Sequence, residues 1–149
     1  MEELIPSVPC RTLTGEIREV PLEAMSFRPA GYGLIFHADK ILLLRNRHTG
    51  KYIFPGGSVH IGERLEAAVI REVQEETGLI VTAESLVHVA DYCFYYAPSD
   101  EAWHCLRFFI IVLFRVVYFK RMPAVTTRTQ NPLVGWPCRP LPLMISNPT

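Results

Sequence analysis

Three glutamates near the middle of the chain have the residue type and spacing of a metal site. Glu72, Glu75 and Glu76 lie three and four residues apart, so on an α-helix their carboxylates share one face. Like charges at these spacings repel one another, and the dipole at a helix C-terminus disfavours them further. A bound divalent cation removes this cost, and hard carboxylate oxygens suit Mg²⁺ or Mn²⁺. Taken alone, this spacing favours a solvated acidic surface beside Arg71, since charge runs at helical spacing are common. The residues around it are what indicate metal-assisted chemistry at a phosphate.

The helix that carries these glutamates is predicted from Glu63 to Thr77. This stretch contains no Pro or Gly and is rich in good helix formers, and Gly78 supplies a left-handed end. At about 100° per residue, Leu65, Ala68 and Val69 form the stripe that packs on a sheet. The three glutamates extend this stripe, whereas an ordinary surface helix would place them on the opposite face.

Apolar runs around the helix predict strands. The alternating stretch 16–20 indicates an edge strand or one arm of a hairpin, and Pro55-Gly56-Gly57 ends the strand before the helix. The last run is predicted to be buried on both faces, because its apolar residues do not alternate with polar ones. The predicted strands are 32–36, 41–44, 52–54, 79–81, 86–96 and 106–119.

The segment from Gly57 onward, GSVHIGERLEAAVIREVQEETGL, resembles the signature of the Nudix (MutT-like) hydrolase family in full. Its fixed positions are matched by Gly57, Glu63, Arg71, Glu72, Glu75, Glu76 and Gly78. The resemblance covers residues 30–119 and implies an α/β fold, the Nudix-type α/β/α sandwich with a mixed, partly antiparallel sheet and a loop leading into the helix. Relatives commonly end in an acidic strand and a covering helix. The tail here shows neither, so a missing covering helix is expected.

The resemblance also implies roles for individual residues. The carbonyl of Gly56 and the carboxylates of Glu72, Glu75 and Glu76 would bind the metal, Mg²⁺ or alternatively Mn²⁺. Arg71 would orient a glutamate by a charge-assisted hydrogen bond with Glu63; the alternative is a plain surface ion pair. The expected catalytic residues are therefore Glu63, Arg71, Glu75 and Glu76.

Two questions about the site stay open at this point. The general base is either Glu75 or Glu76, or it comes from a later position. Since no carboxylate follows Glu101, the later candidates are Asp91, Asp100, Glu101 and, as a weaker choice, His104. Substrate binding is expected from Arg45, Phe54, Gly56 and Gly57. Further candidates are Arg28, Tyr32, Arg47, Tyr95 and Tyr96, with core packing as the alternative for each aromatic residue.

The expected reaction is Mg-dependent hydrolysis of a diphosphate bond in a nucleoside diphosphate linked to another moiety. Such a pyrophosphatase acts on acid anhydrides, and the candidate substrates are nucleoside triphosphates, oxidised nucleotides and nucleotide-sugars such as ADP-ribose. One alternative is a catalytically weak or silent Nudix-like domain that senses nucleotides. Another is an enzyme that processes RNA ends, which a chain of zero net charge does not favour.

The length of 149 residues predicts one folded domain with short extensions. Residues 1–27 are expected to form a strand or hairpin extension, 28–120 the Nudix domain, and 121–149 an irregular Pro-rich tail, either native or from an altered reading frame. The expected partner is a small nucleotide, without DNA or membrane, in a monomer or homodimer. The N-terminus lacks the basic flank and apolar stretch of a secretory signal, which favours a cytoplasmic location.

Overall fold

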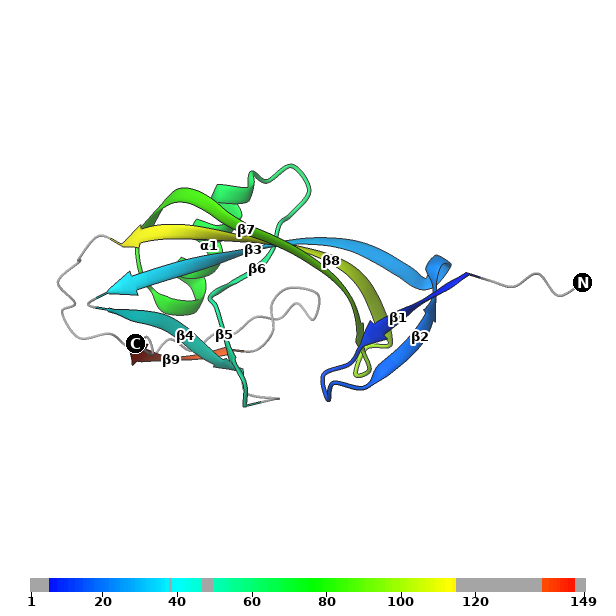
Figure 1. Ribbon diagram of the computed structural model, residues 1–149. Coiled ribbons are helices and arrows are strands. Elements are labelled where there is room, and N and C mark those ends of the chain that lie inside the picture. Colours follow the sequence, from blue (N-terminus) through cyan, green and yellow to red (C-terminus); the bar gives the residue numbers. More distant parts are fainter. Residues whose placement is uncertain (1–5, 38, 47–49, 115–137, 147–149) are drawn as a thin grey trace, which may run out of the picture.

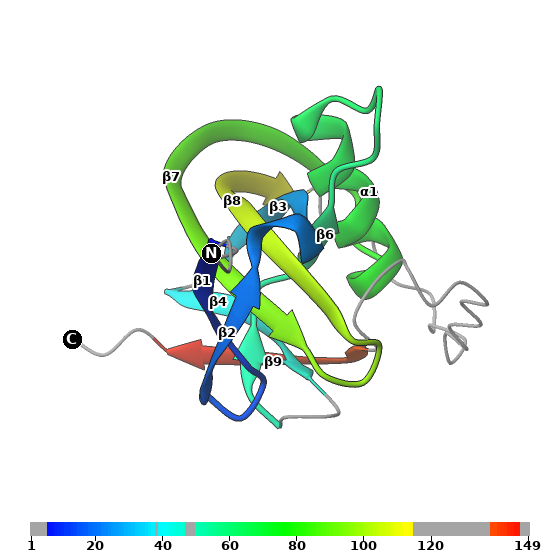
Figure 2. The same cartoon turned by 90° about the vertical axis from the view of Figure 1, so that its right-hand side faces the viewer.

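The computed structural model describes residues 6–37, 39–46 and 50–114, together with the backbone of residues 138–146. Within these residues a single α-helix packs on a strongly curled sheet (Figures 1 and 2). None of the helices described is long and apolar enough to cross a membrane. The elements are β1 (Ser7–Arg11), β2 (Ile17–Pro21), η1 (Leu22–Ala24), β3 (Met25–His37), β4 (Lys40–Asn46), β5 (Tyr52–Ile53), β6 (Gly56–Ser58), α1 (Leu65–Thr77), β7 (Val81–Tyr96), β8 (Glu101–Phe114) and β9 (Cys138–Ser146).

The sheet is mixed, as predicted. Its described strands follow the order β2-β1-β7-β8-β3-β4-β5, with β6 paired to β3 and β9 paired to β4. The β3 strand runs parallel to β8 and antiparallel to β4 and β6. Strands β7 and β8 form a long bent hairpin, and the β1–β2 hairpin lies at the opposite end of it from α1 (Figure 1).

The helix α1 begins at Leu65, two residues later than predicted. Glu63 remains in a turn, because its backbone N–H donates to the carbonyl of His60 at 3.0 Å. The other end agrees with the prediction: Gly78 has a left-handed φ of 74°, and its N–H donates to the carbonyl of Gln74. The sequence therefore placed the end of the helix better than its start.

Two glycines on β3 let the helix approach the sheet closely. A Cβ on Gly31 would lie 2.5 Å from Cγ2 of Val69, and one on Gly33 would lie 2.8 Å from Cγ2 of Val73. Both valines are fully buried. The core that they join consists of Ile35, Leu42, Leu44, Val69, Val73, Val81, Ile110 and Val112. Because α1 sits directly on β3, the residues on its last turns come close to the loop that pairs with the same strand.

Pairing between distant strands extends the strands beyond their sequence predictions. β3 covers 13 residues where 32–36 was predicted, because β8 pairs with it in parallel from Met25 to Ile35. β7 is one strand of 16 residues where two were predicted, and it carries register shifts between 83 and 85 and between 86 and 88. In both cases backbone pairing with β8 extends the strand over residues whose sequence pattern does not itself predict a strand.

The prediction that both faces of β8 are buried is wrong. Ile110 and Val112 are buried among the core residues, but the side chain of Leu113 is 56% exposed. Alternate residues of a strand point to opposite faces, so only the face toward α1 is closed here among the described residues.

The C-terminal predictions fall mostly on residues that the structure does not describe. Residues 115–137 and 147–149 lie outside the described ranges. The end of the strand predicted for 106–119 falls there, and so does the segment for which we predicted that no covering helix forms. Residues 138–146 differ from the irregular chain predicted, because they form β9 along β4. Pro140 and Pro142 lack an N–H on the same side of β9, which an edge strand tolerates. The domain boundaries stay a prediction.

Candidate functional site

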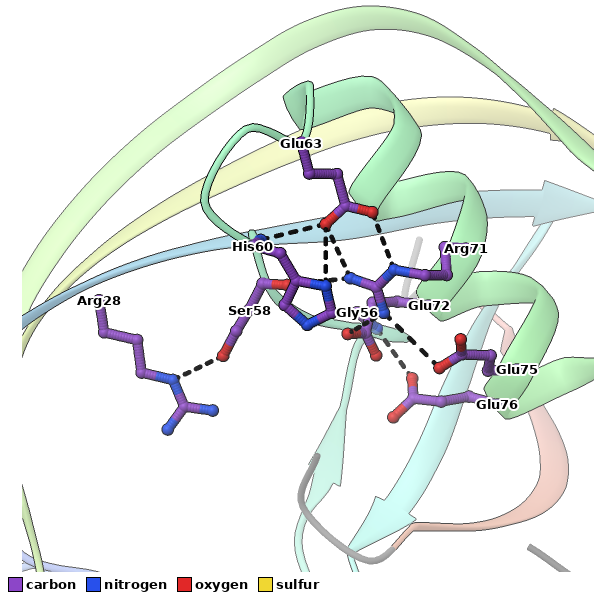
Figure 3. Close-up of polar contacts among 9 residues, drawn as sticks. All are labelled: Arg28, Gly56, Ser58, His60, Glu63, Arg71, Glu72, Glu75 and Glu76. Atoms are coloured by element: carbon purple, nitrogen blue, oxygen red, sulfur yellow. Dashed lines mark hydrogen bonds and ion pairs between the residues drawn. The ribbon is translucent and has the colours of Figure 1, made fainter. Parts of the chain in front are cut away.

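Arg71 joins the loop before α1 to the helix itself (Figure 3). Its Nε and Nη2 donate to the two carboxylate oxygens of Glu63 at 2.8 and 3.0 Å, a bidentate pair. Nη2 also donates to the carbonyl of Ser58 at 3.1 Å, and Nη1 to Glu72 at 2.8 Å. We call these contacts the loop–helix brace. The Arg71 hydrogen bonds lower the pKa of Glu63 to about 2, so that carboxylate stays charged at neutral pH.

Glu72 is the most buried of the three predicted metal ligands, with 4% of its surface exposed. Burial raises its pKa, and the hydrogen bond from Arg71 opposes that rise. A Cβ on Gly57 would lie 2.7 Å from the Glu72 carboxylate carbon, so only glycine leaves room above this group. The helical wheel correctly placed Glu72 beside the apolar stripe.

The two following glutamates lie at the same loop but are more accessible. The side chain of Glu75 is 56% exposed, and its carboxylate is 3.6 Å from Nη1 of Arg71. The carboxylate of Glu76 accepts the backbone N–H of Gly56 at 2.8 Å. The φ of Gly56 is 148°, and a side chain there would collide with the carbonyl oxygen of Gly31, so the loop requires glycine at this position.

The donor set at this loop is chemically suited to a hard cation. It offers the carboxylates of Glu72, Glu75 and Glu76 and a glycine-lined loop in which a Cβ would fill the space at Glu72. As they stand, no three His, Cys, Asp or Glu side chains of the described residues gather at one point that could hold a metal ion. Donors from Arg71 and Gly56 meanwhile occupy oxygens that a cation would use.

A cavity of about 430 Å³ opens beside this loop, with Gly56 and Glu76 in its wall. Its volume lies within the range of roughly 300–1,000 Å³ that is typical of sites for small molecules. Among the described residues, six aromatic side chains line it: Tyr32, Tyr52, Phe54, Tyr92, Phe94 and Phe109. The basic residues of this described lining are Arg11, Lys51 and Arg107. On β3, Tyr32 faces this cavity whereas its neighbours Gly31 and Gly33 face the helix, so the cavity and α1 lie on opposite faces of the strand.

The predicted substrate residues are placed in different surroundings. Phe54, Gly56 and Tyr32 line the large cavity, and Gly57 lines a smaller one of about 20 Å³ next to it. Arg45 lines neither cavity; its Nε donates to the carbonyl of Gly50 at 3.4 Å. Its role as a substrate residue stays a prediction, and Arg47 lies outside the described residues.

The remaining candidates for a general base have local partners away from the loop. Asp100 accepts a hydrogen bond from the Tyr95 hydroxyl, and Glu101 accepts one from Ser99, at the end of the β7–β8 hairpin distant from α1 (Figure 1). Asp91 and His104 are 3.5 Å apart and largely exposed, and neither lines a cavity described above. These contacts favour Glu75 or Glu76.

Sequence reasoning missed three features of the site. Gly31 and Gly33 are spaced two apart in an apolar strand, a signal that indicates close backbone approach. The carbonyl of Ser58 had no signal, because a backbone contact leaves no trace in residue type. Arg107 was visible as a charge inside an apolar run, but only the fold directs it into the cavity.

A family model described as the NUDIX domain matches residues 27–132 of this chain. The chain belongs to the Nudix family. This confirms the family that the motif indicated, and the Nudix loop and helix are the segments β6 and α1 described above.

Individual relatives match shorter parts of this Nudix chain. The ADP-ribose pyrophosphatase of Methanocaldococcus jannaschii is 45% identical over 60 residues, which are 38% of this chain and 36% of that protein. The Nudix hydrolase YvcI of Bacillus subtilis is 44% identical over 43 residues, 29% of this chain and 27% of that protein. The chain therefore spans only about a third of the length of these relatives or less.

Solved structures are also similar to part of this chain. An ADP-ribose pyrophosphatase from Streptococcus suis is 25% identical, with a TM-score of 0.48 over 64% of this chain and 66% of that one. The MutT protein from Methanosarcina mazei is also 25% identical, with a TM-score of 0.47 over 63% and 72%.

Proposed function

We propose that this Nudix protein hydrolyses a diphosphate bond in a nucleoside diphosphate linked to a second moiety, using a divalent cation, Mg²⁺ or Mn²⁺. The observation that carries the proposal is the position of Glu76 and Gly56. They are hydrogen-bonded to each other and both line the 430 Å³ cavity, so a ligand in the cavity reaches two of the four groups predicted to bind the metal. ADP-ribose is one candidate substrate, since a relative bears the name ADP-ribose pyrophosphatase.

The cation would be held by Glu72, Glu75, Glu76 and the carbonyl of Gly56. When bound, it supplies neutralisation of the phosphate charge and a water of lowered pKa. Glu72 is suited to a permanent ligand role, because it is buried and fixed by Arg71.

The chain's own residues then perform two tasks. The loop–helix brace keeps the Gly56–Ser58 strand registered against α1, so that the loop and the carboxylates move as one body. Glu75 is the most exposed of the three glutamates, and we assign to its carboxylate the proton that the attacking water releases.

Turnover assays test this function directly. The purified protein is incubated with nucleoside triphosphates, oxidised nucleotides, ADP-ribose and dinucleoside polyphosphates, with and without Mg²⁺, and the products are separated by chromatography. We expect metal-dependent turnover that Glu75→Gln lowers by at least about 100-fold, the scale of general-base catalysis. Glu66→Gln is the matched control, because Glu66 lies on the same helix, exposed and paired only loosely with Arg64 at 3.7 Å.

The alternative function is a silent nucleotide sensor. That function predicts nucleotide binding without turnover for any substrate in the panel, and equal behaviour of the Glu75 and Glu66 variants. Turnover that persists unchanged in Glu75→Gln contradicts our assignment of the base.

A further inference from the structure

Arg107 lies in the wall of the large cavity without a polar partner for part of its guanidinium. The group sits 4.0 Å from the ring centre of Tyr92 and 5.9 Å from that of Phe109. Among the described residues, its Nε is buried and has no hydrogen-bond partner, and no carboxylate forms an ion pair with it. A partly buried guanidinium that lacks an anionic partner is unfavourable, and because Arg107 lines the cavity, an acceptor on a ligand there can supply that partner.

The charge of the cavity wall shows which kind of acceptor fits. Arg11, Lys51 and Arg107 line it from three different elements or turns, and Glu76 is the acidic residue among the described lining. Three basic side chains thus accompany one carboxylate among these described residues, so the positive charge does not depend on a bound cation. The cavity is therefore an electropositive space in an apolar surround, where an anion interacts strongly with each cation.

The rest of the lining indicates what the anion is attached to. Tyr32 and Phe109 stack with ring centres 5.5 Å apart, and Phe54 meets Phe109 edge-on at 6.0 Å. Tyr52 lies on β5, is 45% exposed and also lines the cavity. Aromatic walls of this kind bind a planar aromatic group such as a nucleobase by stacking.

We propose that Arg107 binds a phosphate oxygen of the substrate inside this cavity, and that the nucleoside of the same molecule occupies the aromatic part. The ligand class is a nucleoside diphosphate, with one phosphate on Arg107 and the second at the cation that the three glutamates of α1 would hold. The proposal rests on the proposed function for the place of the second phosphate. The contact of Arg107 with the first phosphate is independent of catalysis.

Isothermal titration calorimetry in the presence of EDTA measures nucleotide binding without turnover, because EDTA removes the divalent cation that the proposed hydrolysis needs. The probes are ADP and GDP, with adenosine and guanosine as their phosphate-free counterparts. We expect Arg107→Met to weaken diphosphate binding by roughly 10- to 100-fold, the scale of losing charge-assisted hydrogen bonds, and to change nucleoside binding by less than about twofold. Arg107→Lys keeps the charge but loses the planar guanidinium, so its affinity for ADP and GDP should lie between that of the wild type and that of Arg107→Met.

Arg18→Met is the matched control. Arg18 also lies 4.0 Å above a tyrosine ring, that of Tyr95, but it lines neither cavity. We expect it to bind ADP as the wild type does, and near-ultraviolet circular dichroism verifies that each variant is folded.

Three results overturn the proposal. They are equal weakening of ADP and adenosine by Arg107→Met, the same loss in Arg18→Met, or no measurable binding of ADP and GDP by the wild type. If Arg107→Met does not fold, Arg107→Lys decides the outcome: wild-type affinity for ADP counts against the phosphate contact. Absence of turnover in the substrate panel, with ADP binding intact and sensitive to Arg107, rejects the proposed hydrolysis and leaves this inference standing.

Discussion

Replacement of Glu63 by glutamine tests how much the loop–helix brace stabilises the protein. The glutamine has nearly the same shape, but it removes the charge and puts an amide group where Arg71 needs an acceptor. A pKa lowered from 4.5 to about 2 corresponds to about 3 kcal/mol of folding stability at neutral pH. Glu63 is 17% exposed, so solvent screens this interaction only in part.

The pH dependence of this contribution has a definite sign. The folded-state pKa of Glu63 lies below the unfolded value, so the stability it provides is complete above about pH 4.5. It decreases as the pH falls through the window from about 4.5 to about 2. At pH 3.5 we expect about 1 kcal/mol of it to be lost, and the difference between wild type and Glu63→Gln should shrink by that amount.

Urea unfolding at pH 7, 4.5 and 3.5 measures this effect. We expect Glu63→Gln to lower the midpoint by about 1–2 M at pH 7, from an m-value of about 2 kcal/mol/M. Glu66→Gln removes the exposed ion pair with Arg64 and should change the free energy of unfolding by no more than about 0.5 kcal/mol. Equal midpoints for Glu63→Gln and wild type, or a difference that stays constant down to pH 3.5, would refute the reasoning.

Three further substitutions probe the glycines that position the site. Gly31→Ala should cost about 1–3 kcal/mol, and adding Val69→Ala should cost less than the sum of the two, because the added Cβ meets Val69 at 2.5 Å; a double-mutant cycle that is additive contradicts this. Gly57→Ala should lower kcat/KM on the order of 100-fold with a smaller change in unfolding midpoint, since it displaces the Glu72 carboxylate; unchanged kinetics on the identified substrate would rule this out. Gly78→Ala should cost about 1 kcal/mol in thermal unfolding because its φ is 74°, and an unchanged melting temperature would show that the helix end relaxes freely.

The local parts of the site were accessible from residue order alone. The end of α1 at Gly78, the arc that carries Glu72 and the loop at Gly56 follow from helix periodicity and glycine chemistry over a few residues. The pairing of Arg71 with Glu63 was inferred from the family motif, and the structure contains that contact. Each of these depends on residues fewer than about ten positions apart.

Contacts between distant segments could not be predicted in this way. The length of β3, the exposure of Leu113 and the union of two predicted strands into β7 depend on which strands become neighbours. A single sequence does not state those pairings, because every residue type except proline offers the same backbone donor and acceptor.

The sequence by itself determined the family, the order and spacing of the three glutamates and the helix that carries them, because that information is periodic and local. Only the tertiary structure decided that β3 has α1 on one face and the cavity on the other. Curling of the sheet brings Arg107 from β8 and Phe54 from the loop into one cavity with Glu76, and no spacing rule connects these three positions.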